Sequence, residues 1–267
     1  MGGATTGGRI VSRRRGLLIG LEIGVPLAAV ATWWALSSSS RSLYFPPLQQ
    51  IMERFWVNWA QERLATDVAP SLGRLGAGYA IAVVAGVALG VVLGLSPWAR
   101  KLADPLVGFL RSIPSAALLP FAILVFGVGD EMKVFIIAFV SLWPILLNTV
   151  DGVDDADPVM LQSTRIYGIR GARRLFRVVL PAAGPRIAAG MRTSLSLAII
   201  VMIISEMVAS TSGIGHFTLQ AQRSFQITDM WSGIVLLGVL GYLLNLAFLL
   251  FERWLLRWYQ ASRGMRT

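Results

Sequence analysis

The sequence contains no cysteine and only one histidine, His216, among its 267 residues. The lack of cysteine excludes a disulfide framework, and a single histidine excludes the Cys/His clusters that hold zinc. Lysine is almost as scarce, because Lys101 and Lys133 are the only two and neither follows a glycine. The phosphate-binding loop G-x-x-x-x-G-K-[ST] is therefore absent, as are G-x-S-x-G and H-E-x-x-H. We expect no catalytic residue, no metal site, no cofactor bound by this chain and no enzymatic activity of its own.

Charged residues are also few: they make up 14% of the chain, against about a quarter in a soluble domain. Hydrophobic residues reach 55%, and the mean hydropathy is +0.65. A helix needs roughly 20 apolar residues to cross a bilayer. Six stretches approach or exceed that length, at 17–36, 72–95, 105–127, 133–150, 187–209 and 230–251. We predict an all-α polytopic membrane protein with six transmembrane helices in one transmembrane domain, 17–251, and no separate soluble domain.

The net charge of +10 follows the membrane topology, so it does not indicate a nucleic-acid partner. If the N-terminus is cytosolic, the basic residues of the outward segments are only Arg41, Arg54, Arg63 and Arg223. The inward segments hold Arg9, Arg13, Arg14, Arg15, Arg100, Lys101, Arg165, Arg170, Arg173, Arg174, Arg177, Arg186, Arg253, Arg257, Arg263 and Arg266. This asymmetry obeys the positive-inside rule and predicts that both termini are cytosolic. We expect a disordered cytosolic tail at 1–16 and an interfacial cytosolic tail at 252–267.

The longest outward segment, 37–71, contains a predicted amphipathic helix that starts after Pro46 and Pro47. Its apolar residues recur at helical spacing, and they are Leu48, Ile51, Met52, Phe55, Trp56 and Trp59. Its polar side carries Glu53, Arg54 and Asn58. Two arrangements fit this pattern: the helix lies on the outer membrane interface, or its apolar face packs on the rest of the bundle.

The second span carries a row of small residues. Gly86, Gly90 and Gly94 form two overlapping G-x-x-x-G steps on one side of the helix. Small residues four apart let another helix approach closely. The row therefore predicts helix packing and not a ligand site.

Prolines predict several helix boundaries and kinks. Asp104–Pro105 is typical of a helix start, and it predicts that the third span begins there. Pro114 and Pro120 predict kinks within that span, because proline cannot donate a backbone hydrogen bond. Pro181 and Pro185 are predicted to separate the fifth span from the segment before it.

The segment between the fourth and fifth spans, 151–186, is long and basic. Pro158 predicts the start of a helix that runs through Tyr167. Gly168 predicts a break, and a second helical stretch follows at 171–179. The predicted result is a basic helix–turn–helix on the cytosolic side, which can transmit a push from a soluble partner to the spans at both its ends.

The spacing within this segment resembles the "EAA" loop of ABC importer permeases. That pattern is E-A-A, three residues, G, nine residues, then I-x-L-P. Gly168 takes the glycine position, and the I, L and P positions are held by Val178, Leu180 and Pro181. The residues that stand in place of E-A-A are Gln162, Ser163 and Thr164. This departure removes the acidic residue and puts in doubt any salt bridge that it makes with an ATPase.

Further segments resemble the nitrate, taurine and alkanesulfonate branch of these permeases. They are LRSIP at 110–114, LLP at 118–120, FGVGDEMK at 126–133, ISE at 204–206 and SGIG at 212–215. The resemblance covers roughly residues 45–258. It implies a type I importer in the bacterial inner membrane, in which two permease copies line one path. Two cytosolic ATPases that use ATP and Mg bind the loops, and an extracytoplasmic solute-binding protein delivers the solute.

The resemblance and the residue types together give the candidate site residues. The implied ATPase-coupling residues are Gln162, Ser163, Thr164, Arg165, Tyr167, Gly168, Arg170, Arg173, Leu180 and Pro181. Arg111 either snorkels to the inner interface or faces the path, where it would suit an anion such as a sulfonate or nitrate. Other polar candidates for the path, with helix packing as the alternative, are Ser115, Asn148 and Ser194. We expect Glu206 to hold the 207–216 loop through backbone N–H groups, together with Gly213 and Gly215.

Three alternatives stay open. The same class of importer can carry a neutral or cationic solute, such as a pyrimidine precursor or a polyamine. A secondary transporter driven by an ion gradient would need paired intramembrane carboxylates, for which only Glu22 and Glu206 are available. A membrane scaffold without transport activity would have no ATPase partner.

Overall fold

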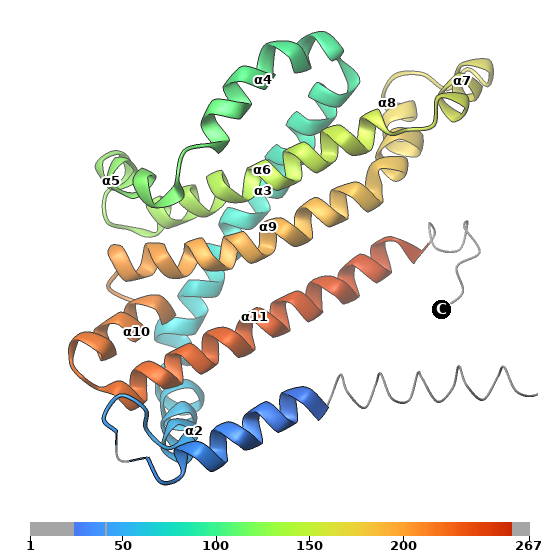
Figure 1. Cartoon of the computed structure of the whole chain (residues 1–267). Helices are drawn as coiled ribbons and strands as arrows, with labels where there is room; N and C mark the ends of the chain where they lie inside the picture. Colours follow the sequence, from blue (N-terminus) through green and yellow to red (C-terminus); the bar gives the residue numbers. More distant parts are fainter. Residues whose placement is uncertain (1–23, 41, 258–267) are drawn as a thin grey trace, which may run out of the picture.

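The computed structural model describes residues 24–40 and 42–257, and every regular element in those residues is a helix. The long helices are α3 (Ala69–Leu95), α6 (Asp130–Asp154), α9 (Leu180–Val208) and α11 (Ile227–Leu255). They pack in that order, α3 on α6, α6 on α9 and α9 on α11 (Figure 1). This confirms the predicted all-α membrane fold. The predicted tail 1–16 and most of the predicted tail 252–267 lie outside the described residues.

Four described helices are long and apolar enough to cross a membrane: Leu64–Leu95, Asp130–Asp154, Gly171–Val208 and Ile227–Leu255. A fifth crossing results if α4 (Pro97–Arg111) and α5 (Ser115–Phe126) together form one span. The described part of the predicted first span is the shorter apolar helix Gly24–Ser37, and the beginning of that span lies outside the described residues. Six spans and two cytosolic termini therefore stay predictions.

The predicted start of the third span is wrong, the predicted interruption at Pro114 is present as a sharp bend, and Pro120 lies inside α5 without ending it. The first helix of this span starts before Asp104–Pro105, because Ser96 caps α4 by accepting a hydrogen bond from the Ala99 N–H at 3.3 Å, and Pro97 follows in the first turn. The helix also does more than kink, since α4 and α5 meet at 92°. Proline disfavours helical backbone in the residue before it and has no N–H to donate. Pro114 is accordingly the N-cap of α5, and the first helix ends before it.

The predicted separation at Pro181 and Pro185 is also wrong. The helix runs without a break through α8 (Gly171–Arg174), the π-helical turn η3 (Leu175–Val179) and α9. In η3 the Leu180 N–H donates to the Leu175 carbonyl, one residue further back than in an α-helix. This wider turn lies directly before Pro181 and gives room for its ring, so the proline is tolerated at the start of α9.

The glycine row of α3 packs against α6, as the sequence predicts. A Cβ added at Gly90 would lie 2.5 Å from the Cβ of Thr149. Gly86 and Gly94 are equally close to α6, because an added Cβ would lie 2.9 Å from Ile145 at the first position and 2.7 Å from Val153 at the second. The two backbones therefore approach to a distance that only glycine allows.

The predicted amphipathic helix is α2 (Leu48–Trp56), continued by the π-helical turns η1 (Val57–Glu62) and η2 (Leu64–Val68). Of the two arrangements left open, the structure shows the packing of this helix on the bundle. Leu48 and Ile51 are buried, and α2 contacts the start of α11. The Trp59 Nε1–H donates to the Ser232 carbonyl of α11 at 3.2 Å. Met52 and Trp56 remain exposed on the outer side of this helix.

Candidate coupling surface and solute path

The predicted helix–turn–helix is present at one end of the bundle, which we call the coupling end (Figure 1). Its first helix is α7 (Pro158–Ile166), close to the predicted range of 158–167. The Ile169 N–H donates to the Thr164 carbonyl at 2.9 Å, which places Gly168 at the left-handed position that ends a helix. Gly168 has φ +67° and Gly171 has φ +58°, so two positions of this turn favour glycine.

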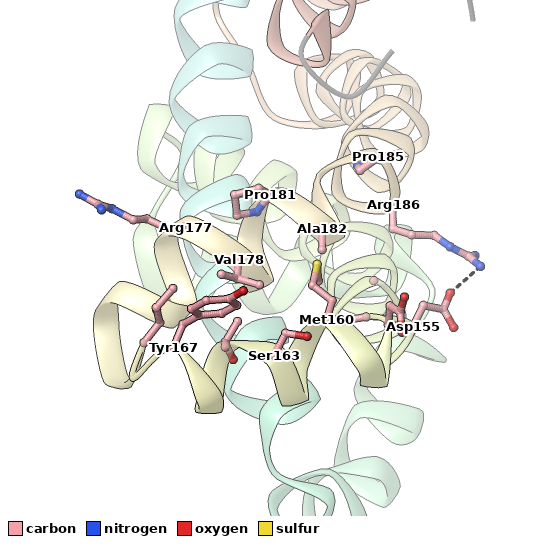
Figure 2. A pocket seen from close by; sticks show the side chains of 15 residues that line it. Asp155, Met160, Ser163, Tyr167, Arg177, Val178, Pro181, Ala182, Pro185 and Arg186 are labelled. Carbon is pink, nitrogen blue, oxygen red and sulfur yellow. Dashed lines mark hydrogen bonds and ion pairs between the residues drawn. The ribbon is translucent and has the colours of Figure 1, made fainter. Parts of the chain in front are cut away.

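A cavity of about 750 Å³ separates α7 from η3 and the start of α9. Figure 2 shows Met160 and Tyr167 facing it from the α7 side, and Val178 facing it from the other side, while Arg177 points away. One end of the segment is tied down by the ion pair of Arg186 with Asp155 at 2.7 Å. The cavity therefore leaves part of α7 without close packing on the span behind it.

The predicted coupling residues differ in how accessible their side chains are to a partner protein. Gln162, Arg170 and Arg173 are exposed, and Tyr167 is 81% exposed. Ser163 donates to the Val159 carbonyl at 2.9 Å, Thr164 is buried, and Leu180 and Pro181 are half-buried. The side chain of Arg165 lies outside the described residues.

The structure adds three apolar residues to this surface that the sequence reading missed. Val159, Ile166 and Phe176 are exposed at the coupling end beside Tyr167. Large apolar side chains between polar neighbours, in a loop predicted to be cytosolic, were the signal that could have found them. We call seven exposed residues of α7, of the turn that follows it and of the adjoining α8 and η3 the coupling surface: Val159, Gln162, Ile166, Tyr167, Arg170, Arg173 and Phe176.

The far end of the bundle, which we call the outer end, is held by a buried ionic network. The Glu206 carboxylate of α9 is fully buried, and Oε1 accepts hydrogen bonds from the Arg74 guanidinium at 2.8 Å and from the Ser71 hydroxyl at 2.7 Å. Its Oε2 accepts the Gly215 N–H at 3.0 Å. This geometry gives Glu206 the loop contact that we expected from the sequence. Arg74 also pairs with Asp130, at 2.7 Å.

The loop before α10 (Ile214–Arg223) closes over this network. Gly213 has φ +118°, and a Cβ added there would collide with the Glu206 carboxylate. The Gly213 N–H donates to Asp67 at 2.7 Å, and Arg74 donates to the Ser212 carbonyl at 3.0 Å. Among the described residues, no group of three His, Asp or Glu side chains is arranged to hold a metal ion. The carboxylates of the network are matched by arginine and by N–H donors instead.

Arg74, Ser71 and Asp130 were missed by the sequence reading, although one signal was present. An arginine inside the apolar run 72–95 must find a partner in order to be buried. Glu206 was the available carboxylate in a neighbouring run.

A second polar cluster ties α2 to α11 at the outer end. The Asp229 carboxylate accepts hydrogen bonds from the Arg54 guanidinium, at 2.5 and 2.8 Å, and from the Asn58 amide at 2.9 Å. The hydrogen bond with Asp229 raises the pKa of Arg54. Arg54 and Asn58 had been assigned to the polar, outward side of the helix, but they make its contact with the bundle.

The four candidates for the solute path form two pairs on different elements, one at the bend between α4 and α5 and one at the contact of α6 with α9. Arg111 is exposed at the end of α4, and Ser115 begins α5 across the 92° bend. Asn148 is half-buried between α6 and α9, where its amide donates to the Pro144 carbonyl at 2.8 Å. Ser194 is fully buried and donates to the Ser141 carbonyl of α6 at 2.6 Å. The structure favours the packing alternative for Ser194, because its buried hydroxyl joins two helices.

The helical bundle has the fold of a chain in an inward-facing structure of the MetNI methionine ABC transporter. The match covers 71% of this chain and 94% of that chain, with a TM-score of 0.64 at 20% identity. Residues 82–260 match the family described as binding-protein-dependent transport system inner membrane component. The chain belongs to this family.

Curated relatives extend the match over most of the chain. The permease SsuC of Escherichia coli, named for aliphatic sulfonates, is 34% identical over 241 residues, which are 89% of this chain and 91% of the relative. The taurine permease TauC of Escherichia coli is 29% identical over 247 residues, 90% of each chain. The bicarbonate permease CmpB of Synechococcus elongatus is 33% identical over 188 residues, 70% of this chain and 68% of the relative.

The family membership decides between the classes left open by the sequence. The chain is a multi-pass inner-membrane permease of an ABC importer, and it is neither an ion-driven transporter nor a scaffold. ATP hydrolysis belongs to separate ATPase subunits, and permeases of this family work with ATPase and binding-protein partners.

Proposed function

We propose that two copies of this chain line one solute path, with one ATPase bound to the coupling surface of each copy and ATP and Mg used by those ATPases. An extracytoplasmic solute-binding protein delivers a small anion, of the sulfonate, taurine or nitrate type, to the outer end. Closure of the ATPases brings the two coupling surfaces together, and the spans attached to them open the path outward.

One observation carries the coupling role: the coupling surface continues directly into a span. An exposed apolar patch between basic residues is a surface that a soluble protein can cover. Here Ile166 and Tyr167 provide the apolar part, and Arg170 and Arg173 provide the basic part. Arg173 and Phe176 of this surface lie on the unbroken helix from Gly171 to Val208, so a displacement of that part moves a membrane-spanning helix with it.

Of the three residues that replace E-A-A, only the first has a side chain that is accessible to an ATPase. Thr164 is buried and Ser163 bonds its own helix, so neither side chain is free for an ATPase. Gln162 is exposed and stands where the acidic residue is expected. It can give and accept neutral hydrogen bonds but no salt bridge, so this permease contacts its ATPase at that point without a charge.

Substitution of Gly168 tests the coupling role. An added Cβ meets no atom within 4 Å at this position. A substitution therefore causes no clash and changes only the energy of the left-handed backbone at φ +67°. Valine tolerates that backbone poorly, at a cost of about 1–2 kcal/mol, whereas asparagine tolerates it well. We expect Gly168→Val to lower the solute carried per ATP hydrolysed about tenfold in reconstituted vesicles, while Gly168→Asn stays close to the wild type. A normal transport ratio in Gly168→Val would contradict the coupling role.

The anionic solute is supported by the relatives and by the bend of the third span. The names of the relatives specify aliphatic sulfonates, taurine and bicarbonate, and each of these carries an anionic group. They favour an anion over a pyrimidine precursor or a polyamine. In this chain Arg111 and the N-terminus of α5 flank the same break, and both favour negative charge.

Arg111→Ala is expected to lower the uptake of a labelled alkanesulfonate or taurine about tenfold, because a charge-assisted hydrogen bond to the solute is lost. Arg111→Lys should keep part of the uptake, since it retains the charge without the planar guanidinium. Arg253→Ala, at the end of α11, is the control for the loss of one positive charge. Unchanged uptake and an unchanged range of solutes in Arg111→Ala would exclude this contact.

A further inference from the structure

The turn between α10 and α11 holds a bulky residue in left-handed backbone. Phe225 has φ +55°, and among the described residues it is the only non-glycine with a positive φ. Its N–H donates to the Gln222 carbonyl at 3.1 Å, and the Gln226 N–H donates to the Ala221 carbonyl at 2.9 Å. These two bonds form a Schellman motif, in which the left-handed position is usually glycine. A phenylalanine here has a conformational cost that glycine would avoid.

Packing within the chain does not offset this cost. The Phe225 side chain is 68% exposed, so it buries little apolar surface on its own protein. Ser224 and Gln226 on either side of it are exposed as well. Backbone strain that is not repaid by packing is concentrated at ligand clamps, switches and interaction sites.

Two polar hollows flank this turn. A hollow of about 430 Å³ lies toward α2 and is lined by Gln50, Glu53 and Thr228 among others. A hollow of about 380 Å³ lies on the other side, with His216 and Gln220 in its wall. Gln226 lines both of them. A protruding aromatic ring between polar recesses has the arrangement of a protein–protein contact, in which an apolar anchor is surrounded by a polar rim.

The charges near the turn favour a soluble partner over lipid. Glu53 lines the first hollow, and Glu62 lies further along the same helical segment, at the end of η1. Both are exposed, and neither forms an ion pair with another residue in the described part of the chain. An unpaired carboxylate is costly among acyl chains but not in water. The ring contacts of Trp231 with Trp33 and Phe45, by contrast, form a cluster typical of a membrane-interface anchor.

We propose that the 224–226 turn and its two flanking hollows form the docking site of the extracytoplasmic solute-binding protein, with Phe225 as the apolar anchor. We call this docking site the seat. The proposal rests on the proposed function, because the family is defined by its dependence on a binding protein. The charge asymmetry of the sequence assigns this end of the bundle to the outside. The Phe225 ring enters an apolar recess of the partner, and Glu53 and Glu62 face basic groups around that recess.

The variant Phe225→Gly tests the binding of the partner without a loss of stability in the permease itself. The probe is the purified, solute-loaded binding protein encoded with the transporter, titrated onto the permease–ATPase complex in nanodiscs. We expect the half-saturating concentration for ATPase stimulation to rise about tenfold, as for the loss of an interface anchor. Basal ATPase activity and the thermal midpoint should equal or exceed those of the wild type, because glycine fits the left-handed position.

Tyr242→Ala is the matched control, since Tyr242 is also 68% exposed but lies within the span α11. It should leave the half-saturating concentration unchanged. An unchanged concentration in Phe225→Gly overturns the seat, and a lowered thermal midpoint without loss of stimulation assigns the ring to lipid and overturns it as well. If the wild-type complex is not stimulated by the binding protein at all, the proposed function falls together with the seat.

The charge contribution has its own test. The double variant Glu53→Lys, Glu62→Lys should slow association of the binding protein several-fold at low salt, and the difference should shrink as salt screens it. Surface plasmon resonance on the captured complex measures both rates. Association at the wild-type rate in low salt would exclude the role of these two carboxylates in the seat.

Discussion

Alanine in place of Glu206 is expected to destabilise the protein by about 3–5 kcal/mol, which is the usual cost of breaking a buried ion pair. The change would leave the buried Arg74 guanidinium with Asp130 as its only carboxylate, and the Asp130 side chain is 65% exposed. It would also deprive the Gly215 N–H of its acceptor. The measurement is the thermal unfolding midpoint of the purified chain in detergent, with the monodisperse fraction as a second readout.

Two further variants provide reference values for the loss of stability expected in Glu206→Ala. Glu206→Gln should be intermediate, because an amide oxygen can accept from Arg74 while the amide N–H₂ cannot accept from Gly215. Asp154→Ala removes the exposed ion pair with Arg100 and should cost less than about 1 kcal/mol. Equal midpoints for Glu206→Ala and Asp154→Ala would show that the network contributes no more than a surface pair.

Leucine at Gly90 is expected to prevent stable assembly of α3 on α6. A Cβ there would lie 2.5 Å from Thr149, and the remaining side-chain atoms have no space between the helices. The two backbones must then separate along a contact that runs most of their length, at a cost of about 3 kcal/mol or more. The expected result is loss of monodisperse protein after extraction from membranes.

Gly76→Leu is the control, because it makes the same substitution on the same helix. An added Cβ at Gly76 meets no atom within 4 Å, and the residue is exposed. This variant should be extracted and should unfold like the wild type. If both variants behave alike, the helix tolerates leucine for reasons unrelated to packing, and the role of the glycine row is refuted.

The sequence predicted those elements whose determinants are local. Pro158 and Gly168 gave the start of α7 and the turn after it, because proline fits a first helical turn and glycine fits a left-handed one. The glycine row of α3 was recognised because a spacing of four residues places small side chains on one face. In each case the relevant residues lie within about two turns of one another.

Features that depend on contacts between residues far apart in the sequence could not be predicted from single segments. Arg74 and Glu206 are separated by 132 residues, and only the packing of α3 beside α9 brings them together. The continuity of the helix through Pro181 required the wider turn η3, for which no residue pattern was evident. Ser194 had the residue type of a path-lining side chain, but its orientation toward α6 was set by tertiary packing.

Helix α9 joins the coupling end to the outer network, so the two ends cannot move independently. Its 29 residues extend about 43 Å, and a tilt of about 5° about the midpoint would move each end by roughly 2 Å. A shift of that size is enough to break the hydrogen bond between Glu206 and the Gly215 N–H, which is 3.0 Å long in this conformation. The helix therefore acts as a lever, and a displacement of about 2 Å at the coupling end is enough to reach a hydrogen bond at the outer end.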